Sequence, residues 1–174
     1  MTTGAGVIAG ISVSHSDASL DALEAADVES QRAATAALLD DPAVSEAMVL
    51  QTCNRVEGYV VTDDPAAGHV ALDSLMGDVD PGVVREMGHE ESLRHLLRVA
   101  AGLESLVLGE DQILGQVRDA VDDARSVGGI GPVLDDGVTK ALHVGERART
   151  ETAINEGAVS LASAAVRLAG AECS

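Results

Sequence analysis

The sequence predicts an α+β fold, in which a small and mostly antiparallel sheet with packed helices is followed by a helical section. Short apolar runs bounded by turn residues alternate with Ala-rich segments early in the chain, and the pattern is helical after Pro81. Hydrophobic residues make up 46% of the 174 residues, which is enough for a packed core. Because Tyr59 is the only aromatic residue, that core has to be built from aliphatic side chains.

Three short segments have the composition of strands. The first is 7–13, and the other two, 47–52 and 56–62, flank a tight polar link over 53–55. A link this short makes the chain reverse direction at once. We therefore expect the second and third strands to form a hairpin with the polar link at its bend.

The remaining segments have helical composition or spacing. We expect helices within 20–39, where Asp27 is a candidate cap for a second helix, and over about 66–76. Pro42, after two aspartates, ends the first of these segments. The four later helices are expected at about 93–100, 110–127, 133–149 and 157–170.

The chain is strongly acidic. Asp and Glu number 29 against 11 Lys and Arg, which gives a formal charge of −18. Such a polyanion repels nucleic acid at ordinary ionic strength, which argues against a broad RNA-binding surface. At molar salt the Debye length falls to about 3 Å and self-repulsion is largely screened. The composition therefore indicates a protein from a salt-loaded cytoplasm or, as the alternative, an acidic mesophilic protein.

Several classes of protein do not fit the sequence. No stretch approaches the roughly 20 apolar residues of a membrane span, and no basic-then-apolar leader opens the chain, so we expect a soluble cytoplasmic protein. Cys53 and Cys173 lie far apart and outside any CxxC or Cys/His spacing, which argues against a disulfide framework or a structural zinc site. No GxGxxG motif or Gly-rich phosphate loop is present.

Cys53 is the sharpest candidate for chemistry. It lies in the predicted bend, beside Thr52, Asn54 and Arg55. A thiol at a loop tip on a rigid scaffold is in the kind of position where reactive groups commonly occur, and a guanidinium two residues on favours the nucleophilic thiolate. The alternative is a small buried residue that caps a strand, although such a position rarely has polar neighbours.

Two further candidates lie in the helical section. Gln112 and Gln116 are four residues apart on one helical face, and with Ser105 they offer hydrogen bonds to a polar substrate. The alternative is an ordinary solvated helix face. His95 lies off the apolar stripe of its predicted helix, so it is either a solvated side chain or a general acid–base group.

Three motifs resemble signatures of the glutamyl-tRNA reductase family. The segment 51–57 (QTCNRVE) resembles the family's TCNRxE signature, and 104–113 (ESLVLGEDQI), followed by Gln116, resembles its second signature. The segment 145–165 resembles a third, which leads into a nucleotide-binding domain. By this resemblance, 1–150 is the catalytic, substrate-binding domain.

The resemblance implies an activity, the NADPH-dependent reduction of glutamyl-tRNA to glutamate-1-semialdehyde, at the start of tetrapyrrole (haem) synthesis. Cys53 matches the family nucleophile, which attacks the ester, releases tRNA and leaves a glutamyl thioester that hydride reduces. His95 matches a histidine important for activity, and we expect it to act as general acid on the departing ribose oxygen. The implied substrate contacts are Thr52, Asn54, Arg55 as a bidentate carboxylate partner, Ser105, Glu110, Asp111, Gln112 and Gln116.

The resemblance also implies what lies outside this chain. Residues 151–174 would begin the connection to an NADPH-binding domain, so we expect the chain alone not to complete the reduction. A homodimer of the full-length protein and contact with glutamate-1-semialdehyde aminomutase are implied too. His15 is followed by SDAS where the family usually has Ala-Pro, which leaves no role for it. The alternative functions are a domain that binds glutamate or the tRNA acceptor end without covalent capture, and a scaffold with Cys53 buried.

Overall fold

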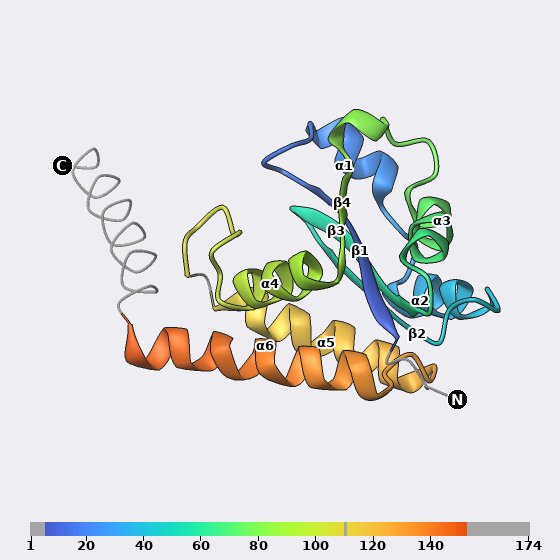
Figure 1. Cartoon of the computed structure of the whole chain (residues 1–174). Helices are drawn as coiled ribbons and strands as arrows, with labels where there is room; N and C mark the ends of the chain where they lie inside the picture. Colours follow the sequence, from blue (N-terminus) through green and yellow to red (C-terminus); the bar gives the residue numbers. More distant parts are fainter. Residues whose placement is uncertain (1–5, 110, 153–174) are drawn as a thin grey trace.

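The computed structural model describes residues 6–109 and 111–152. In this part of the chain, strands and helices alternate first and three helices follow (Figure 1). The elements are β1 (Val7–Ser14), α1 (Leu20–Ala26), α2 (Gln31–Leu39), β2 (Glu46–Thr52), β3 (Arg55–Thr62), α3 (Pro65–Met76), the 3-10 turn η1 (Pro81–Val83), β4 (Arg85–Met87), α4 (His89–Ala100), α5 (Gln112–Ser126) and α6 (Pro132–Glu151).

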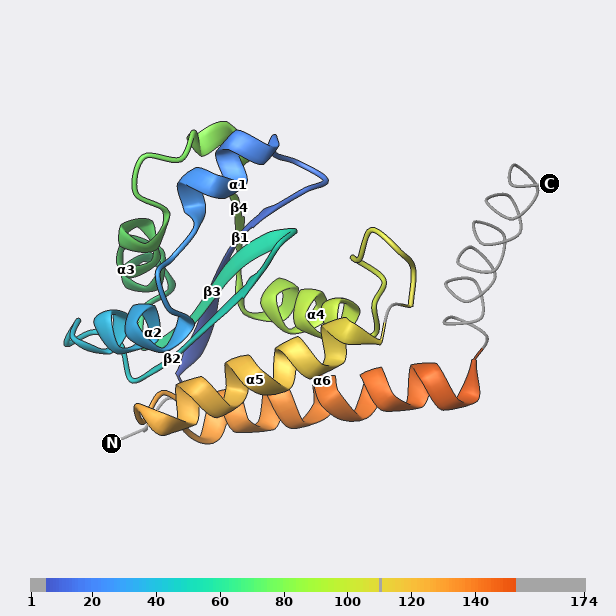
Figure 2. The same ribbon diagram turned by 180° about the vertical axis from the view of Figure 1, so that it is seen from behind.

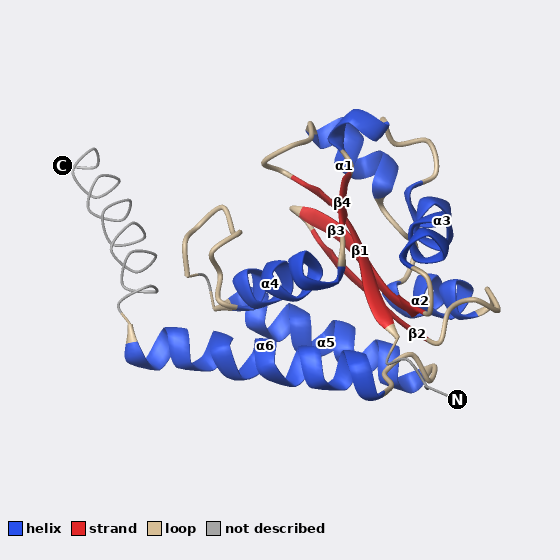
Figure 3. Ribbon diagram, in the orientation of Figure 1, coloured by secondary structure: helices blue, strands red, loops and turns tan. Residues whose placement is uncertain are grey.

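The four strands form one antiparallel sheet in the order β2-β3-β1-β4, with helices on both faces (Figure 3). Because side chains alternate along a strand, each face contributes to its own core. Val49 and Val60 pack in the cluster on the side of α1, α2 and α3, whereas Met48 and Tyr59 pack in the cluster formed with α4, α5 and α6. Figure 2 shows α5 and α6 side by side on this second face. The predicted α+β fold is confirmed.

The hairpin of β2 and β3 is tighter than the sequence suggested. Thr52 pairs with Arg55, so only Cys53 and Asn54 form the turn, and Arg55 is the first residue of β3. The side chains of residues 55, 57 and 59 therefore share one face of the strand. This is the face that α4, α5 and α6 cover.

Three other expectations about element boundaries are wrong. The chain after Pro81 is not purely helical, because β4 pairs with β1 over three residues. Asp27 ends α1 through its backbone N–H, and Ser30 caps α2 instead, with its side chain accepting from the amide of residue 33. The helix α5 begins at Gln112, so Asp111 precedes it. The predicted helix at 157–170, most of the third motif and Cys173 lie outside the described residues.

The loop between α4 and α5 is closed by two glycines. Gly102 and Gly109 have φ angles of 80° and 74°, and the amide of Gly109 donates to the carbonyl of Gly102 at 3.1 Å. A Cβ on Gly102 would lie 2.8 Å from the Cα of Gly109. Only glycine adopts this conformation at little cost and leaves room for the contact. The loop carries Glu104 and Ser105, so its closure helps to place them.

None of the helices within 6–109 and 111–152 is long and apolar enough to cross a membrane.

We predict that Gly102→Ala destabilises the protein more than Gly77→Ala. Both positions have positive φ, which costs an alanine about 1–2 kcal/mol. At Gly77 nothing lies within 4 Å of the added Cβ, whereas at Gly102 the backbone of Gly109 has to move. Urea unfolding of the two variants measures the difference. Equal losses would show that the contact between the two loop glycines contributes nothing.

Candidate active site

Cys53 lies at the tip of the β2–β3 hairpin and is exposed to solvent. The turn is held from two sides. The amide of Asn54 donates to the hydroxyl of Thr52 at 3.2 Å, and the amide of His15 donates to the carbonyl of Asn54 at 2.9 Å. The interpretation of Cys53 as a buried packing residue is therefore wrong, because its polar neighbours mark a turn that projects beyond the sheet.

Most of the predicted substrate contacts meet at one small cavity beside this thiol, which we call the Cys53 cavity. Three segments contribute: the hairpin tip, the α4–α5 loop and the first turns of α5. The i, i+4 spacing brings both glutamines to the same side of α5, as predicted. The lining residues are Thr52, Cys53, Asn54, Arg55, Ser105, Gln112, Ile113 and Gln116.

Two of the predicted site residues that the structure describes, Asp111 and His95, do not line the Cys53 cavity. Asp111 is exposed, and its carboxylate accepts from the Nε of Arg149 at 3.0 Å, which ties α6 to the start of α5. His95 lines a different hollow, which is formed by β4 and α4. Glu110 lies outside the described residues, so its predicted contact is untested.

Arg55 is buried, and two of its nitrogens have protein partners. Nη1 donates to the Oε1 of Glu57 at 2.9 Å, and Nη2 donates to the backbone carbonyl of Glu104. The carboxylate that Arg55 pairs with in this structure is thus the protein's own. Its predicted pairing with a substrate carboxylate stays a prediction, and it would have to use the remaining N–H groups.

Glu57 is the centre of this buried network, and the sequence analysis assigned it no role. Its Oε1 accepts from Arg55, from the Nε2 of His95 at 2.7 Å and from Ser12 at 3.2 Å, and its Oε2 accepts from Tyr59 at 2.6 Å. Its side chain is fully buried. The signal in the sequence was a glutamate within an otherwise apolar strand and at the end of the 51–57 motif.

The charges around Glu57 keep it ionised. Burial by itself would raise the pKa of Glu57, but the hydrogen bond from His95 and the charges of His95 and Arg55 outweigh it. The hydrogen bond from Tyr59 acts in the same direction, and the pKa falls from its usual 4.5 to about 2. An ionised carboxylate only accepts hydrogen bonds, so the Nε2 of His95 has to carry a proton.

His95 is buried, with 5% of its surface exposed, so the interpretation of a solvated side chain is wrong. Its Nε2 bonds Glu57, and its Nδ1 is buried with no hydrogen-bond partner in the described part of the chain. The described contacts connect its ring to the Cys53 cavity through Glu57 and Arg55. Its predicted role as general acid stays a prediction.

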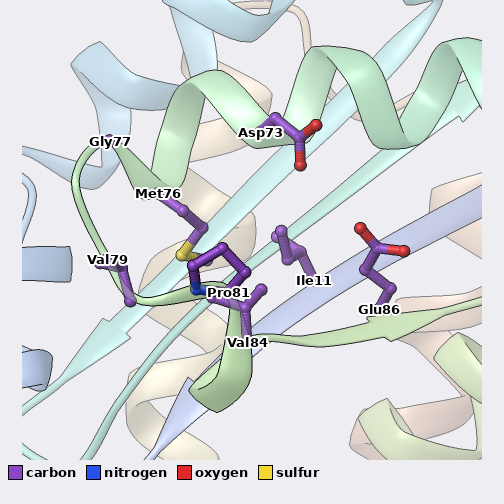
Figure 4. Close-up of a pocket in the computed structure, with 8 residues that line it drawn as sticks. All are labelled: Ile11, Asp73, Met76, Gly77, Val79, Pro81, Val84 and Glu86. Atoms are coloured by element: carbon purple, nitrogen blue, oxygen red, sulfur yellow. The ribbon is translucent and has the colours of Figure 1, made fainter.

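A larger hollow lies between α3, η1 and β4, and none of the predicted site residues lines it. Figure 4 shows the carboxylates of Asp73 and Glu86 at this hollow, together with the apolar side chains of Met76, Pro81 and Val84. It contains no thiol, imidazole or cationic group. Size alone would select this hollow, but its chemistry offers no nucleophile, so we assign the site to the Cys53 cavity.

Comparison with known proteins agrees with the motifs. The family model for the N-terminal domain of glutamyl-tRNAGlu reductase matches residues 11–152. The chain belongs to the glutamyl-tRNA reductase family. The resemblance stated from the sequence is thereby confirmed, and the Cys53 cavity lies within the matched part of this reductase domain.

Named relatives and a solved structure support the assignment. The chain is 66% and 62% identical, over 169 residues, to the glutamyl-tRNA reductases of Haloarcula marismortui and Natronomonas pharaonis, covering 97% of this chain and 38% and 37% of theirs. It matches the structure of glutamyl-tRNA reductase from Methanopyrus kandleri with a TM-score of 0.80 and 37% identity, over 96% of this chain and 40% of that one. The chain thus spans about two fifths of the length of these reductases. Both of these relatives come from halophilic archaea, in agreement with the acidic composition.

We predict that Glu57→Gln lowers the free energy of unfolding at pH 7 by about 3–5 kcal/mol, because Arg55 keeps a buried charge without its partner. A carboxyl whose pKa is lower in the folded state stabilises the fold above its unfolded pKa, near 4.5, and loses that contribution as the pH falls toward about 2. The difference in free energy of unfolding between wild type and variant, measured by chemical denaturation, should therefore become smaller as the pH falls through that range. The exposed Glu90→Gln serves as control, with a change below about 0.5 kcal/mol at every pH. A gap that stays constant from pH 7 to pH 3 would contradict the assigned ionisation.

Proposed function

We propose that this chain is the part of a glutamyl-tRNA reductase that transfers glutamate from glutamyl-tRNA to Cys53 as a thioester. The observation that carries the proposal is an exposed thiol at a rigid hairpin tip, facing a cavity lined by amide, hydroxyl and guanidinium groups. Family membership supplies the substrate, since the relatives are named for it. The reduction to glutamate-1-semialdehyde, as the first step of tetrapyrrole synthesis, is proposed for the full-length protein.

In the proposed step, the thiolate of Cys53 attacks the ester carbonyl carbon. A carbon–sulfur bond forms, the bond to the ribose oxygen breaks, and that oxygen leaves with a proton. His95 is the proposed donor of this proton, from Nδ1, because Nε2 is held by Glu57. Ser105, Gln112 and Gln116, with Thr52, Asn54, Arg55, Glu110 and Asp111, are the proposed contacts for glutamate.

The cofactor of the full reaction does not fit the residues present. NADPH supplies hydride, and its binding needs a phosphate-binding loop, but the sequence contains no GxGxxG motif. We propose that the NADPH site lies in another part of the full-length protein. Formation of a homodimer, transfer of the aldehyde to glutamate-1-semialdehyde aminomutase, and a cytoplasmic location are further proposals for the full-length protein.

A binding domain without covalent capture is the second candidate. What favours it is that, among the described residues, none forms a hydrogen bond or ion pair with the Cys53 thiol, although amide and hydroxyl groups line the cavity beside it. This candidate predicts affinity for glutamyl-tRNA and no adduct. The two candidate functions differ in one observable, which is whether a covalent bond forms between glutamate and the sulfur of Cys53.

The test is incubation of the chain with glutamyl-tRNA carrying radiolabelled glutamate. We predict a protein-bound label that hydroxylamine releases, because a thioester is cleaved by that nucleophile. Cys53→Ser should lose the label, and Cys173→Ser, which removes the other thiol, should keep it. No label on the wild type while binding persists would favour the second candidate. Equal label on wild type and Cys53→Ser would contradict the assigned nucleophile.

A further inference from the structure

Three arginines gather at one hollow formed by β4 and α4, which we call the arginine hollow. Arg85 comes from β4, and Arg94 and Arg98 lie one turn apart on α4. The chain has only 11 Lys and Arg in total and a net charge of −18, so this is a marked concentration of cations. The hollow has a volume of about 300 Å³ and is lined by Arg85, Glu90, Glu91, Arg94, His95 and Arg98.

An unpaired buried nitrogen belongs to the same hollow. His95 is one of its lining residues, and only 5% of its surface is exposed. Glu57 holds Nε2, so Nδ1 is the ring nitrogen left without a partner among the described residues. A buried polar atom without a hydrogen bond costs about 1–3 kcal/mol. A ligand that places a polar atom against Nδ1 would recover that cost.

The arginines can exchange their present partners. Arg85 pairs with Glu91 at 2.7 Å with both side chains about half exposed, and Arg98 pairs with Glu104 at 2.6 Å. Exposed pairs of this kind are worth about 0–1 kcal/mol. No described carboxylate lies within ion-pair distance of Arg94. A phosphate accepts two parallel N–H bonds from a guanidinium, so it can replace these partners at low cost.

The chemistry of the hollow selects a ribose-phosphate unit over a free phosphate. A phosphodiester offers acceptors to the guanidinium groups, and the sugar hydroxyl beside it can both donate and accept a hydrogen bond, so it can pair with the Nδ1 of His95. Glu90 and Glu91 oppose a dense anion, which favours a single phosphodiester over a cluster of phosphates.

The hollow is connected to the Cys53 cavity by hydrogen bonds through two residues, Glu57 and Glu104. Glu57 bonds both His95, which lines the hollow, and Arg55, which lines the cavity. Glu104 bonds both Arg98 and Arg55. One substrate that placed glutamate at the cavity and its carrier at the hollow would therefore contact both ends of this network. We propose that the arginine hollow binds the ribose-phosphate backbone at the 3′ end of the RNA that carries the glutamate, a proposal that rests on the proposed function.

The test separates the carrier from the amino acid. Wild type, Arg94→Gln and the matched control Arg32→Gln, which removes an exposed arginine from α2, are labelled with glutamyl-tRNA and with a small activated ester of glutamate that has no RNA. For Arg94→Gln we expect the glutamyl-tRNA concentration at half-maximal labelling to rise about tenfold, with a weaker dependence on salt. Labelling by the small ester should not change, and Arg32→Gln should behave as wild type.

Three outcomes would overturn the proposal. Glutamyl-tRNA labelling of Arg94→Gln that matches wild type would show that the hollow does not contact RNA. An equal loss with the small ester would show that Arg94 supports the cavity structurally. If wild type takes no label from either substrate, the proposed function fails. Filter binding of uncharged tRNA then tests separately whether the arginine hollow binds RNA. In that case, equal affinity of wild type and Arg94→Gln for the tRNA would refute the hollow as an RNA site.

Discussion

A single buried carboxylate holds the functional part of this domain together. Glu57 keeps its charge inside the protein only because β1, β3 and α4 each bring it a hydrogen-bond donor. A buried charge of this kind is costly unless every lone pair is satisfied, so its neighbours are held to one geometry. Arg55 extends the network to the α4–α5 loop. Arg55 of this network lines the Cys53 cavity, and His95 lines the arginine hollow.

The acidic composition changes how the few cations are used. Most described arginines form exposed pairs such as Arg125 with Asp135 or Arg147 with Glu151, which contribute little and weaken further in salt. Arg55 and Arg149 differ from these, because their side chains are only 2% and 8% exposed. The buried pair of Arg55 and Glu57 is therefore the one that salt screens least among those named here.

Local patterns in the sequence predicted what is local in the structure. The hairpin around Cys53, the shared face of Gln112 and Gln116, and the exposure of the thiol follow from nearest neighbours and periodicity. The burial of His95 does not, because its partner Glu57 lies 38 residues away and the two meet only after α4 packs on the sheet. The strand β4 was missed for the same reason, since its three residues become a strand only by pairing with β1.

If the Glu57 network shapes the cavity beside Cys53, a glutamyl ligand can shield this thiol only while the network is intact. The most direct measurement is the rate at which iodoacetamide alkylates Cys53, with and without a stable amide analogue of glutamyl-adenosine. We expect the analogue to slow alkylation of Cys53 in wild type, and we expect Glu57→Gln to be alkylated at the same rate with and without it. Alkylation of wild-type Cys53 at one rate, whether or not saturating analogue is present, would contradict this expectation.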